Sequence, residues 1–279
     1  MSKLDEARIK IDEIDAKMAE LFKQRMEAVK EIADYKNERG LPVEDKDREQ
    51  GIIDANMKAV DDEKLKPLYM DFLQTTMDIS KKYQHRTING LNVVCGGEKQ
   101  VDVFAAEKAF PEGKITHYER FEDAYKAVED GKFDVAVLPL DNSYKGDVGR
   151  VYDLIFKGNL YVNSIRSMAH GGSTARYAVL SRVKNDQNLT SETESFMIMF
   201  TVKDEVGALA NAISVISGYG YNMKTLRSRP MRDSAWNHYF YVELTGETSP
   251  GSDERLLAGL KEVCPMAKIA GYFCDDTEI

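Results

Sequence analysis

The sequence predicts a multidomain chain of three parts: an all-α helical domain, a small α/β lobe and a ferredoxin-like βαββαβ domain. In residues 1–87 apolar residues recur at helical spacing, and a single glycine, Gly40, precedes position 51. Residues 88–186 alternate short β-type runs with helical runs, which is an α/β pattern. Residues 192–279 follow the order β-α-β-β-α-β, which is typical of ferredoxin-like domains.

The expected elements can be placed by residue number. In the first part we expect helices at about 3–38, 46–61 and 64–84, with Pro42 and Pro67 where a helix can start. In the second we expect strands at 91–95, 114–118, 134–140 and 177–181 and helices at 101–110, 121–131 and 149–158. Polar residues 187–194 predict a linker. In the third we expect strands at 195–202, 221–228, 238–246 and 267–273 and helices at 207–220 and 253–264.

Composition excludes several classes of function. The chain of 279 residues has a net charge of −9, so it lacks the overall basic surface of a nucleic-acid-binding protein. The three cysteines are scattered without a CxxC pair, and the four histidines lie far apart. We therefore expect a reducing compartment, no disulfide scaffold, no metal and no cofactor. No apolar run of about 18 residues occurs, which predicts a cytoplasmic protein without a secretory signal or a membrane partner.

The first helix carries an apolar seam with a cation inside it. Counted in heptads, one core position holds Leu4, Ile11, Met18, Arg25 and Ile32, and the other holds Ala7, Ile14, Leu21 and Ala28. Arginine is seldom buried unless it is paired. Arg25 therefore either extends to solvent or to a glutamate of its own chain, or it is a buried cation that awaits an anionic ligand.

Two further cations lie on a flank of this seam. Arg8 and Lys36 are 28 residues apart, or about 42 Å at about 1.5 Å per residue, which no metabolite spans. Arg25 and Lys36, about 16 Å apart by the same rule, are close enough to bracket one small ligand. Arg8 can serve that ligand only from a second, antiparallel chain. A long helix that cannot bury its seam alone also predicts a homodimer or a higher homo-oligomer.

Polar residues of the other two helices share faces. Asp45, Arg48, Glu49 and Ile52 have the spacing i, i+3, i+4, i+7, and Ser80 and Gln84 are one turn apart. A solvated helix start is the simplest explanation of the first group. Taken together, however, these residues offer cations, carboxylates, a hydroxyl and an amide without a histidine or cysteine nucleophile. That set suits a small dianion and a reaction that needs electrostatic positioning.

Residues 4–84 resemble the all-helical chorismate mutases. The residues that carry the resemblance are RIKIDEID from Arg8, then Arg25, Lys36, PVEDKDRE at 42–49 and SKKYQ at 80–84. The resemblance implies conversion of the substrate chorismate to prephenate by a pericyclic rearrangement. It implies that Arg8 of a partner chain, Arg25 and Arg48 hold the carboxylates, and that Lys36 and Gln84 bind the ether oxygen. Asp45, Glu49 and Ser80 would line the pocket near the hydroxyl and a carboxylate.

Residues 121–155, with FAAEKAF at 104–110, resemble prephenate dehydratase, but with altered motifs. The G-P-x-G-[ST] loop of that family is GGEKQ at 96–100, its Glu-Asn-Ser is Asp141-Asn142-Ser143, and its Thr-Arg-Phe is Ala175-Arg176-Tyr177. Most of a second lobe is also missing after residue 162, and a cleft needs two walls. We expect no dehydratase activity. The lobe is then a structural connector, or it binds another anion, for example through Lys99 or Arg176.

Residues 195–273 resemble an ACT regulatory domain of the dehydratase type. The resemblance implies that paired domains bind phenylalanine as the effector, through Gly207, Ala208, Leu209, Asn222, Ser228, Arg229 and Pro230. Arg227 stands where that family has a glutamate, which disfavours a nearby α-ammonium. The sequence thus predicts a chorismate mutase with an ACT sensor in aromatic amino acid biosynthesis. Two alternatives remain: a bifunctional enzyme that still makes phenylpyruvate, and a non-catalytic amino-acid-binding protein that uses its helices only to dimerise.

Overall fold

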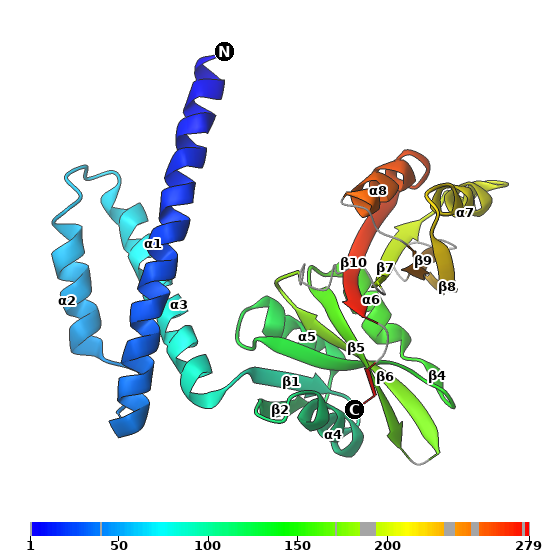
Figure 1. The fold of residues 1–279 in the computed structure, drawn as a ribbon, viewed down its shortest axis with the longest axis horizontal. Coiled ribbons are helices and arrows are strands. Elements are labelled where there is room, and N and C mark those ends of the chain that lie inside the picture. The colour runs from blue at the N-terminus through cyan, green and yellow to red at the C-terminus, as the bar shows by residue number, and fades with distance from the viewer. Residues whose placement is uncertain are drawn as a thin grey trace. The chain divides into compact units, whose positions relative to one another are not determined.

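The computed structural model describes residues 2–39, 41–170, 172–184, 194–231, 238–246, 251–274 and 277–278. The chain divides into two compact units, Met1–Gly90 and Leu91–Ile279, which are drawn as ribbons in Figure 1. We call them the helical unit and the α/β unit. In the described part of the chain, no helix has both the length and the apolar character to cross a bilayer. Residues 187–193 of the expected linker lie outside the described residues.

The helical unit contains α1 (Lys3–Arg39), α2 (Lys46–Met57) and α3 (Lys66–Asn89), as the sequence predicts. Its small core joins Val29 and Ala33 of α1 to Leu73 and Met77 of α3, all buried. The boundaries differ from expectation in two places. α2 ends four residues early because the acidic run that follows is unfavourable at the negative end of a helix. α3 continues to Asn89, where Gly90 adopts a positive φ of 74° and ends it.

The α/β unit begins with a lobe, residues 91–184. In it β1 (Asn92–Gly96) lies between β2 (Lys114–Tyr118) and β3 (Val135–Asn142), all parallel. The helices are α4 (Lys99–Ala109), α5 (Phe121–Glu129) and α6 (Gly149–Lys157). The hairpin of β5 (Tyr161–His170) and β6 (Ser173–Ser181) adds antiparallel strands next to β3. Two short strands, β4 (Gly146–Asp147) and β11 (Thr277–Glu278), pair with β3 and β5. The sequence did not predict β5, which occupies the place where a second lobe would start.

A ferredoxin-like part, residues 194–274, completes the α/β unit. Its elements are β7 (Glu194–Thr201), α7 (Ala208–Gly218), β8 (Asn222–Pro230), β9 (His238–Thr245), α8 (Ser252–Val263) and β10 (Met266–Cys274). They follow the expected β-α-β-β-α-β order, and the strands lie in the order β10-β7-β9-β8. β10 also pairs with β5, so the strands of the lobe and of this part form one continuous sheet.

Helix α6 of the lobe covers the face of the ferredoxin-like sheet that α7 and α8 leave open. Along β9, Phe240 and Val242 pack with the core under α7 and α8, whereas Tyr239 and Tyr241 belong to the core of the lobe. Tyr241 stacks on Tyr152 of α6 with ring centroids 3.9 Å apart, and Phe156 stacks on Tyr239 at 4.2 Å. Alternate residues of one strand therefore hold two layers together.

Charged pairs border these stacked rings. Arg229 of β8 donates two hydrogen bonds to Asp153 of α6, at 3.0 and 3.1 Å. Arg227, one alternation earlier, pairs with Asp147. Both arginines lie on the same face of β8 and pair with carboxylates of the lobe. These ion pairs fix the position of β8 against the lobe, in addition to the burial of the stacked rings.

Gly271 lies where the strands of the lobe join those of the ferredoxin-like part, and this gives a testable prediction. Gly271 is in register with Val162, and a Cβ at Gly271 would collide with the backbone of Val162. We expect Gly271→Ala to lower the free energy of unfolding by more than about 2 kcal/mol, because backbone cannot move aside as a flexible side chain can. Gly218→Ala, at a helix end with open space around it, is the matched control and should change stability by less than about 1 kcal/mol. Urea unfolding measures both; equal effects would contradict the strand contact.

Candidate functional site

Arg25 is turned toward α3. Its guanidinium hydrogen-bonds the hydroxyl of Ser80 and, at 3.5 Å, the carbonyl oxygen of Thr76. Burial lowers the pKa of Arg25, while Ser80 is only 5% exposed. The sequence left two explanations open for Arg25. In the structure its side chain extends inward rather than to solvent, and its partners there are neutral groups. No glutamate pairs with it in the described part of the chain. Its positive charge is therefore available to an anion.

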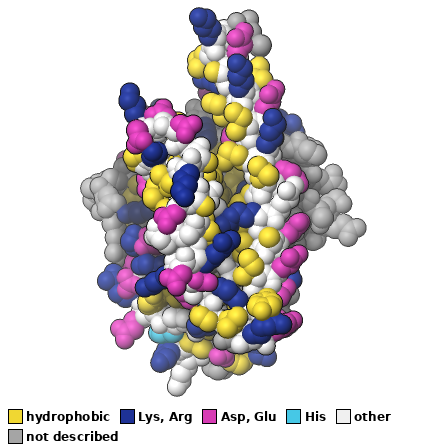
Figure 2. All heavy atoms as spheres, turned by 90° about the vertical axis from the view of Figure 1, so that its left-hand side faces the viewer, with side chains coloured by type: hydrophobic (Ala, Val, Ile, Leu, Met, Phe, Trp, Pro, Cys, Tyr) yellow, Lys and Arg dark blue, Asp and Glu magenta, His cyan; other side chains and the backbone are white. Residues whose placement is uncertain are grey.

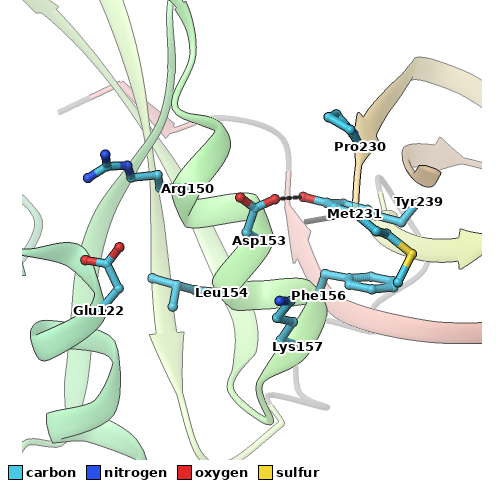
Figure 3. A pocket seen from close by; sticks show the side chains of 9 residues that line it. All are labelled: Glu122, Arg150, Asp153, Leu154, Phe156, Lys157, Pro230, Met231 and Tyr239. Atoms are coloured by element: carbon cyan, nitrogen blue, oxygen red, sulfur yellow. Dashed lines mark hydrogen bonds between the residues drawn. The ribbon is translucent and has the colours of Figure 1, made fainter. Parts of the chain in front are cut away.

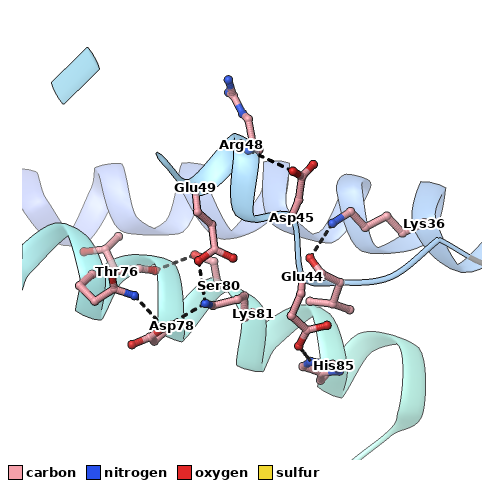
Figure 4. A network of polar contacts seen from close by, with 12 residues as sticks. Lys36, Glu44, Asp45, Arg48, Glu49, Thr76, Asp78, Ser80, Lys81 and His85 are labelled. Atoms are coloured by element: carbon pink, nitrogen blue, oxygen red, sulfur yellow. Dashed lines mark hydrogen bonds and ion pairs between the residues drawn. The ribbon is translucent and has the colours of Figure 1, made fainter. Parts of the chain in front are cut away.

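The segment that joins α1 to α2 brings further polar groups to the same side of α3 (Figure 4). Lys36 donates a 2.7 Å hydrogen bond to the carbonyl oxygen of Val43. Glu49 pairs with Lys81 at 3.0 Å, and Glu44 lies 3.1 Å from His85. One turn of α3, at Ser80, therefore contacts Arg25 of α1. Lys81 and His85 of α3 contact the segment 43–49. Sequence reasoning missed Lys81, because one lysine among many gives no signal before its partner is known.

Gln84 is the unusual residue of this group. It is 8% exposed, and its Oε1 is sealed from water without a hydrogen-bond partner among the described residues. A buried carbonyl oxygen left unpaired costs free energy that a group with an N–H or O–H donor can recover. Gln84 lies one turn beyond Ser80 on α3, and so it extends the row of polar groups that Arg25 begins.

Three of the residues predicted from the sequence stand apart from this row. Arg8 is exposed on the first turns of α1 and lies about 26 Å along the helix from Arg25. Asp45 is the N-cap of α2, where its carboxylate accepts a 3.0 Å hydrogen bond from the backbone N–H of Arg48. The exposed side chain of Arg48 extends away from α3 in Figure 4. Within one chain, therefore, Arg25 contacts Ser80, and Gln84 lies one turn further along α3. Glu49 reaches the same helix through Lys81, and Lys36 contacts the segment that precedes α2.

The apolar seam of α1 is uncovered in the single chain. Large hydrophobic side chains on it are exposed by 45–63%: Leu4, Ile11, Ile14, Met18 and Leu21. Figure 2 shows apolar side chains along this helix. The face that α1 turns to α3 is a different one, built on Val29 and Ala33. An apolar stripe of this length is typical of a surface that another chain covers.

The lobe of the α/β unit holds a cavity of about 370 Å³. Carboxylates of three residues line it, Glu98, Asp102 and Asp141, together with apolar side chains and Tyr177. Asp102 is 4% exposed and accepts a 3.0 Å hydrogen bond from the hydroxyl of Tyr177. Burial raises the pKa of Asp102 to about 6, and the hydrogen bond from Tyr177 opposes part of that rise. Sequence reasoning missed Asp102, since an aspartate in a first helical turn is usually only a favourable charge.

A smaller cavity of about 170 Å³ lies where α6 meets β8 and β9. Figure 3 shows Arg150, Glu122 and Lys157 around it, with Asp153 hydrogen-bonded by the hydroxyl of Tyr239 at 2.7 Å. In the described part of the chain, no group of three or more histidine, cysteine, aspartate or glutamate residues is arranged to hold a metal ion.

Two family models match the chain: chorismate mutase type II over residues 7–85 and prephenate dehydratase over residues 101–167. The chorismate mutase of Methanocaldococcus jannaschii is 33% identical over 94 residues, which cover 32% of this chain and 95% of that protein. The bifunctional chorismate mutase/prephenate dehydratase of Aquifex aeolicus is 22% identical over 98% of each chain. The chain belongs to the chorismate mutase/prephenate dehydratase family. Its helical unit is a chorismate mutase, an isomerase of aromatic amino acid biosynthesis.

Part of the Aquifex enzyme has no counterpart in this chain. The alignment with the Aquifex enzyme runs over 364 positions, whereas this chain has 279 residues. At least 85 aligned positions therefore have no counterpart here. The match to the dehydratase family ends at residue 167, inside β5. The α/β unit nevertheless keeps the fold: a prephenate dehydratase of Arthrobacter aurescens, solved in complex with L-Phe, superposes with a TM-score of 0.55 at 15% identity, covering 66% of this chain and 90% of that one.

The dehydratase motifs of this lobe meet in the structure but are altered. Asp141 pairs in register with Arg176 across β3 and β6, and the two side chains form an ion pair at 3.3 Å. Arg176 also binds Glu243 of β9 at 2.8 Å, so two carboxylates share its charge. Gly97 adopts a φ of +115°, which proline cannot adopt. The loop therefore cannot follow the path of the family's G-P-x-G sequence.

The predicted effector residues lie at two ends of the ferredoxin-like part. Tyr239 is in register with both Thr201 and Arg229, so the start of α7 and the end of β8 lie at the same end of the sheet. That end holds Gly207, Ala208, Leu209, Ser228, Arg229 and Pro230. Asn222 begins β8 at the opposite end. Gly207 has a positive φ of 84° with open space around it, so its backbone conformation by itself explains the glycine.

Asp102 gives a prediction about pH. The pKa of Asp102 is about 6 in the folded state and 3.8 as the ordinary value, so between about pH 4 and pH 6 the folded protein binds a proton that the unfolded chain has released. The stability that this proton contributes is lost as pH rises through that window. We expect Asp102→Asn, which keeps an acceptor for Tyr177, to be about 2–3 kcal/mol more stable than the parent at pH 8, and nearly equal at pH 4. Urea unfolding at both values tests this, with exposed Asp130→Asn as the control; a gap that does not depend on pH would contradict it.

Proposed function

We propose that the mutase site is a composite of two chains and that the protein releases prephenate without dehydrating it. In this site Arg25 and Arg48 of one chain and Arg8 of the partner bind the two carboxylates of chorismate. Lys36 and Gln84 bind the ether oxygen, and Asp45, Glu49 and Ser80 line the pocket near the substrate hydroxyl and a carboxylate. The observation that carries this proposal is the guanidinium of Arg25, which is turned inward to Ser80 and has no anionic partner among the described residues. Gln84, buried one turn further along α3, would donate to the ether oxygen through its Nε2–H.

The physical chemistry supports this assignment. Negative charge grows on the ether oxygen as the C–O bond breaks, so a fixed ammonium and an amide directed at it stabilise the transition state more than the ground state. Lys36 retains two protons for a ligand after its hydrogen bond to Val43. Holding both carboxylates gathers a flexible diacid into a compact reactive conformer, which removes freedom before the chemistry begins.

A second chain is part of the proposal for two reasons. Arg8 lies far from its expected partners in one chain, and the seam of α1 beside it is exposed. An antiparallel copy of α1 would cover that seam and carry its own Arg8 toward the Arg25 end of this site. Arg48 and Asp45, at the exposed start of α2, would then turn toward the substrate when it binds.

The lobe supports the absence of dehydratase activity. Prephenate is a dicarboxylate, and the cavity of the lobe is lined by three carboxylates and one lysine. The cation that the altered motif retains, Arg176, is already shared by Asp141 and Glu243. Like charges at short range disfavour binding of the substrate. Burial also raises the pKa of Asp141 despite its pairing with Arg176, which indicates that further negative charge is poorly tolerated there.

For the ferredoxin-like part we propose an ACT-type sensor that binds phenylalanine between two chains. The solved dehydratase named above binds L-Phe. Asn222 lies at the opposite end of β8 from Pro230, so these residues converge on one ligand only if a partner domain supplies one of them. Arg229, held by Asp153 of α6, would transmit occupancy of such a site to the lobe.

The first experiment quantifies prephenate and phenylpyruvate from chorismate at neutral pH, with and without L-phenylalanine. We expect prephenate alone.

The Lys36→Ala variant should lose about 2–4 kcal/mol of transition-state stabilisation, by analogy with the loss of an oxyanion-hole donor. Lys30→Ala, which removes an exposed lysine of the same helix that pairs with Asp34, is the matched control and should keep the parent rate. Phenylpyruvate above the spontaneous rate would refute the missing dehydratase, and near-normal turnover of Lys36→Ala would refute its role. No response to phenylalanine would refute the sensor proposal.

Mixing two inactive variants tests the composite site. Arg8→Ala and Lys36→Ala should each be nearly inactive alone. If they are unfolded together, refolded and allowed to exchange chains, half of the dimers are mixed. One site in each mixed dimer is then intact, so about a quarter of the parent activity should return. Mixing Lys36→Ala with Arg25→Ala is the control: both altered residues belong to the same chain's part of the site, so no site is intact and no activity should return. Recovery in the first mixture no greater than in this control would exclude a site shared in this way.

A further inference from the structure

The cavity of the lobe is built differently from a site for an anion. Its walls combine apolar side chains, which are Val101, Phe121, Pro139, Val148 and Ala175, with the carboxylates of Glu98, Asp102 and Asp141. Its volume of about 370 Å³ lies within the range of about 300–1,000 Å³ in which small-molecule sites usually fall. An apolar pocket with a few fixed polar groups is the usual form of such a site.

Two of the three carboxylates already have a cation. Glu98 pairs with Lys145 at 3.5 Å, and Asp141 pairs with Arg176 at 3.3 Å. Asp102 differs, because it receives hydrogen bonds from neutral donors, the Tyr177 hydroxyl and the backbone N–H of Glu98. Across the described ranges of the chain, Asp102 makes no ion pair, although it is 96% buried.

The position of Asp102 is fixed by its neighbours. Gly97 packs so closely that a Cβ there would meet both Asp102 and Phe121 at about 2.5–2.6 Å. Tyr177, itself 1% exposed, fixes the other side of the carboxyl group. A carboxylate that is held rigidly, buried and unpaired with a cation is costly in the empty cavity. A cation that enters the cavity would offset that cost.

We propose that this cavity binds a small primary amine with an apolar, ring-sized body, whose ammonium group pairs with Asp102. The ammonium donates to the Asp102 carboxylate, and the body packs against Phe121, Pro139 and Val148. An anionic ligand is disfavoured by the Asp102 carboxylate, which has no ion-pair partner among the described residues. The site is independent of the mutase reaction, because none of its residues belongs to the helical unit.

Three probes of similar size and different charge test the proposal by calorimetry with the full chain at pH 8. They are 2-phenylethylamine, the neutral 2-phenylethanol and the anionic 3-phenylpropionate. We expect the amine to bind at least tenfold more tightly than the alcohol, since a charge-assisted hydrogen bond is stronger than a neutral one. The carboxylate should show no binding. Equal binding of the carboxylate, or no heat from the amine at millimolar concentration, would overturn the proposal.

Matched variants test whether the ammonium group of the ligand pairs with Asp102. Asp102→Asn keeps the size of the side chain and an acceptor for Tyr177, so it should weaken the amine at least tenfold and leave the alcohol unchanged. Asp130→Asn, an exposed carboxylate beside Lys126, should alter neither. Unchanged binding of 2-phenylethanol by both variants verifies that the cavity is still folded. Amine affinity that survives Asp102→Asn would show that the ammonium lies elsewhere and would reject the site.

Discussion

The uncovered face of a four-stranded sheet is the constraint around which the α/β unit is built. A ferredoxin-like sheet has helices on one face, and its other face must be buried by something else. Here α6 supplies that cover, with Tyr152 and Phe156 stacked on Tyr241 and Tyr239. The same contact fixes Asp153 against Arg229. Because one helix serves both the lobe and the ferredoxin-like part, the two share a core.

The helical unit shows the reverse situation, in which a surface lacks its cover. The core of the single chain is small, and the seam at the N-terminal half of α1 is exposed. The polar groups around Arg25 and Gln84 are likewise incomplete: among the described residues the Gln84 carbonyl oxygen has no donor, and the Arg25 guanidinium has neutral partners but no anion. The helical unit thus has both exposed apolar area and unsatisfied polar groups. Both indicate that this unit gains stability when it binds a second chain and a substrate.

The lobe illustrates how a fold persists while its chemistry changes. The register of Asp141 against Arg176 keeps the strand pairing of the dehydratase-like motifs. Glu243 then accepts a hydrogen bond from a second nitrogen of that arginine from another strand, and Asp102 adds a buried carboxyl group. The backbone topology is tolerant of such substitutions, whereas the sign of the electrostatic potential inside a cavity is decided by two or three side chains.

The sequence by itself determined the three helices, the β-α-β-β-α-β order and the shortened lobe, because periodicity, turn residues and length are local properties. Helical spacing also placed Ser80 and Gln84 on one face of α3, where both are buried. Only the tertiary structure decided that Asp45 caps α2, that Arg229 pairs with Asp153, and that Asp102 lines a cavity. Each of these depends on residues that are distant in sequence or on one choice among several partners. Burial and pairing are properties of the assembled chain, and no local pattern specifies them.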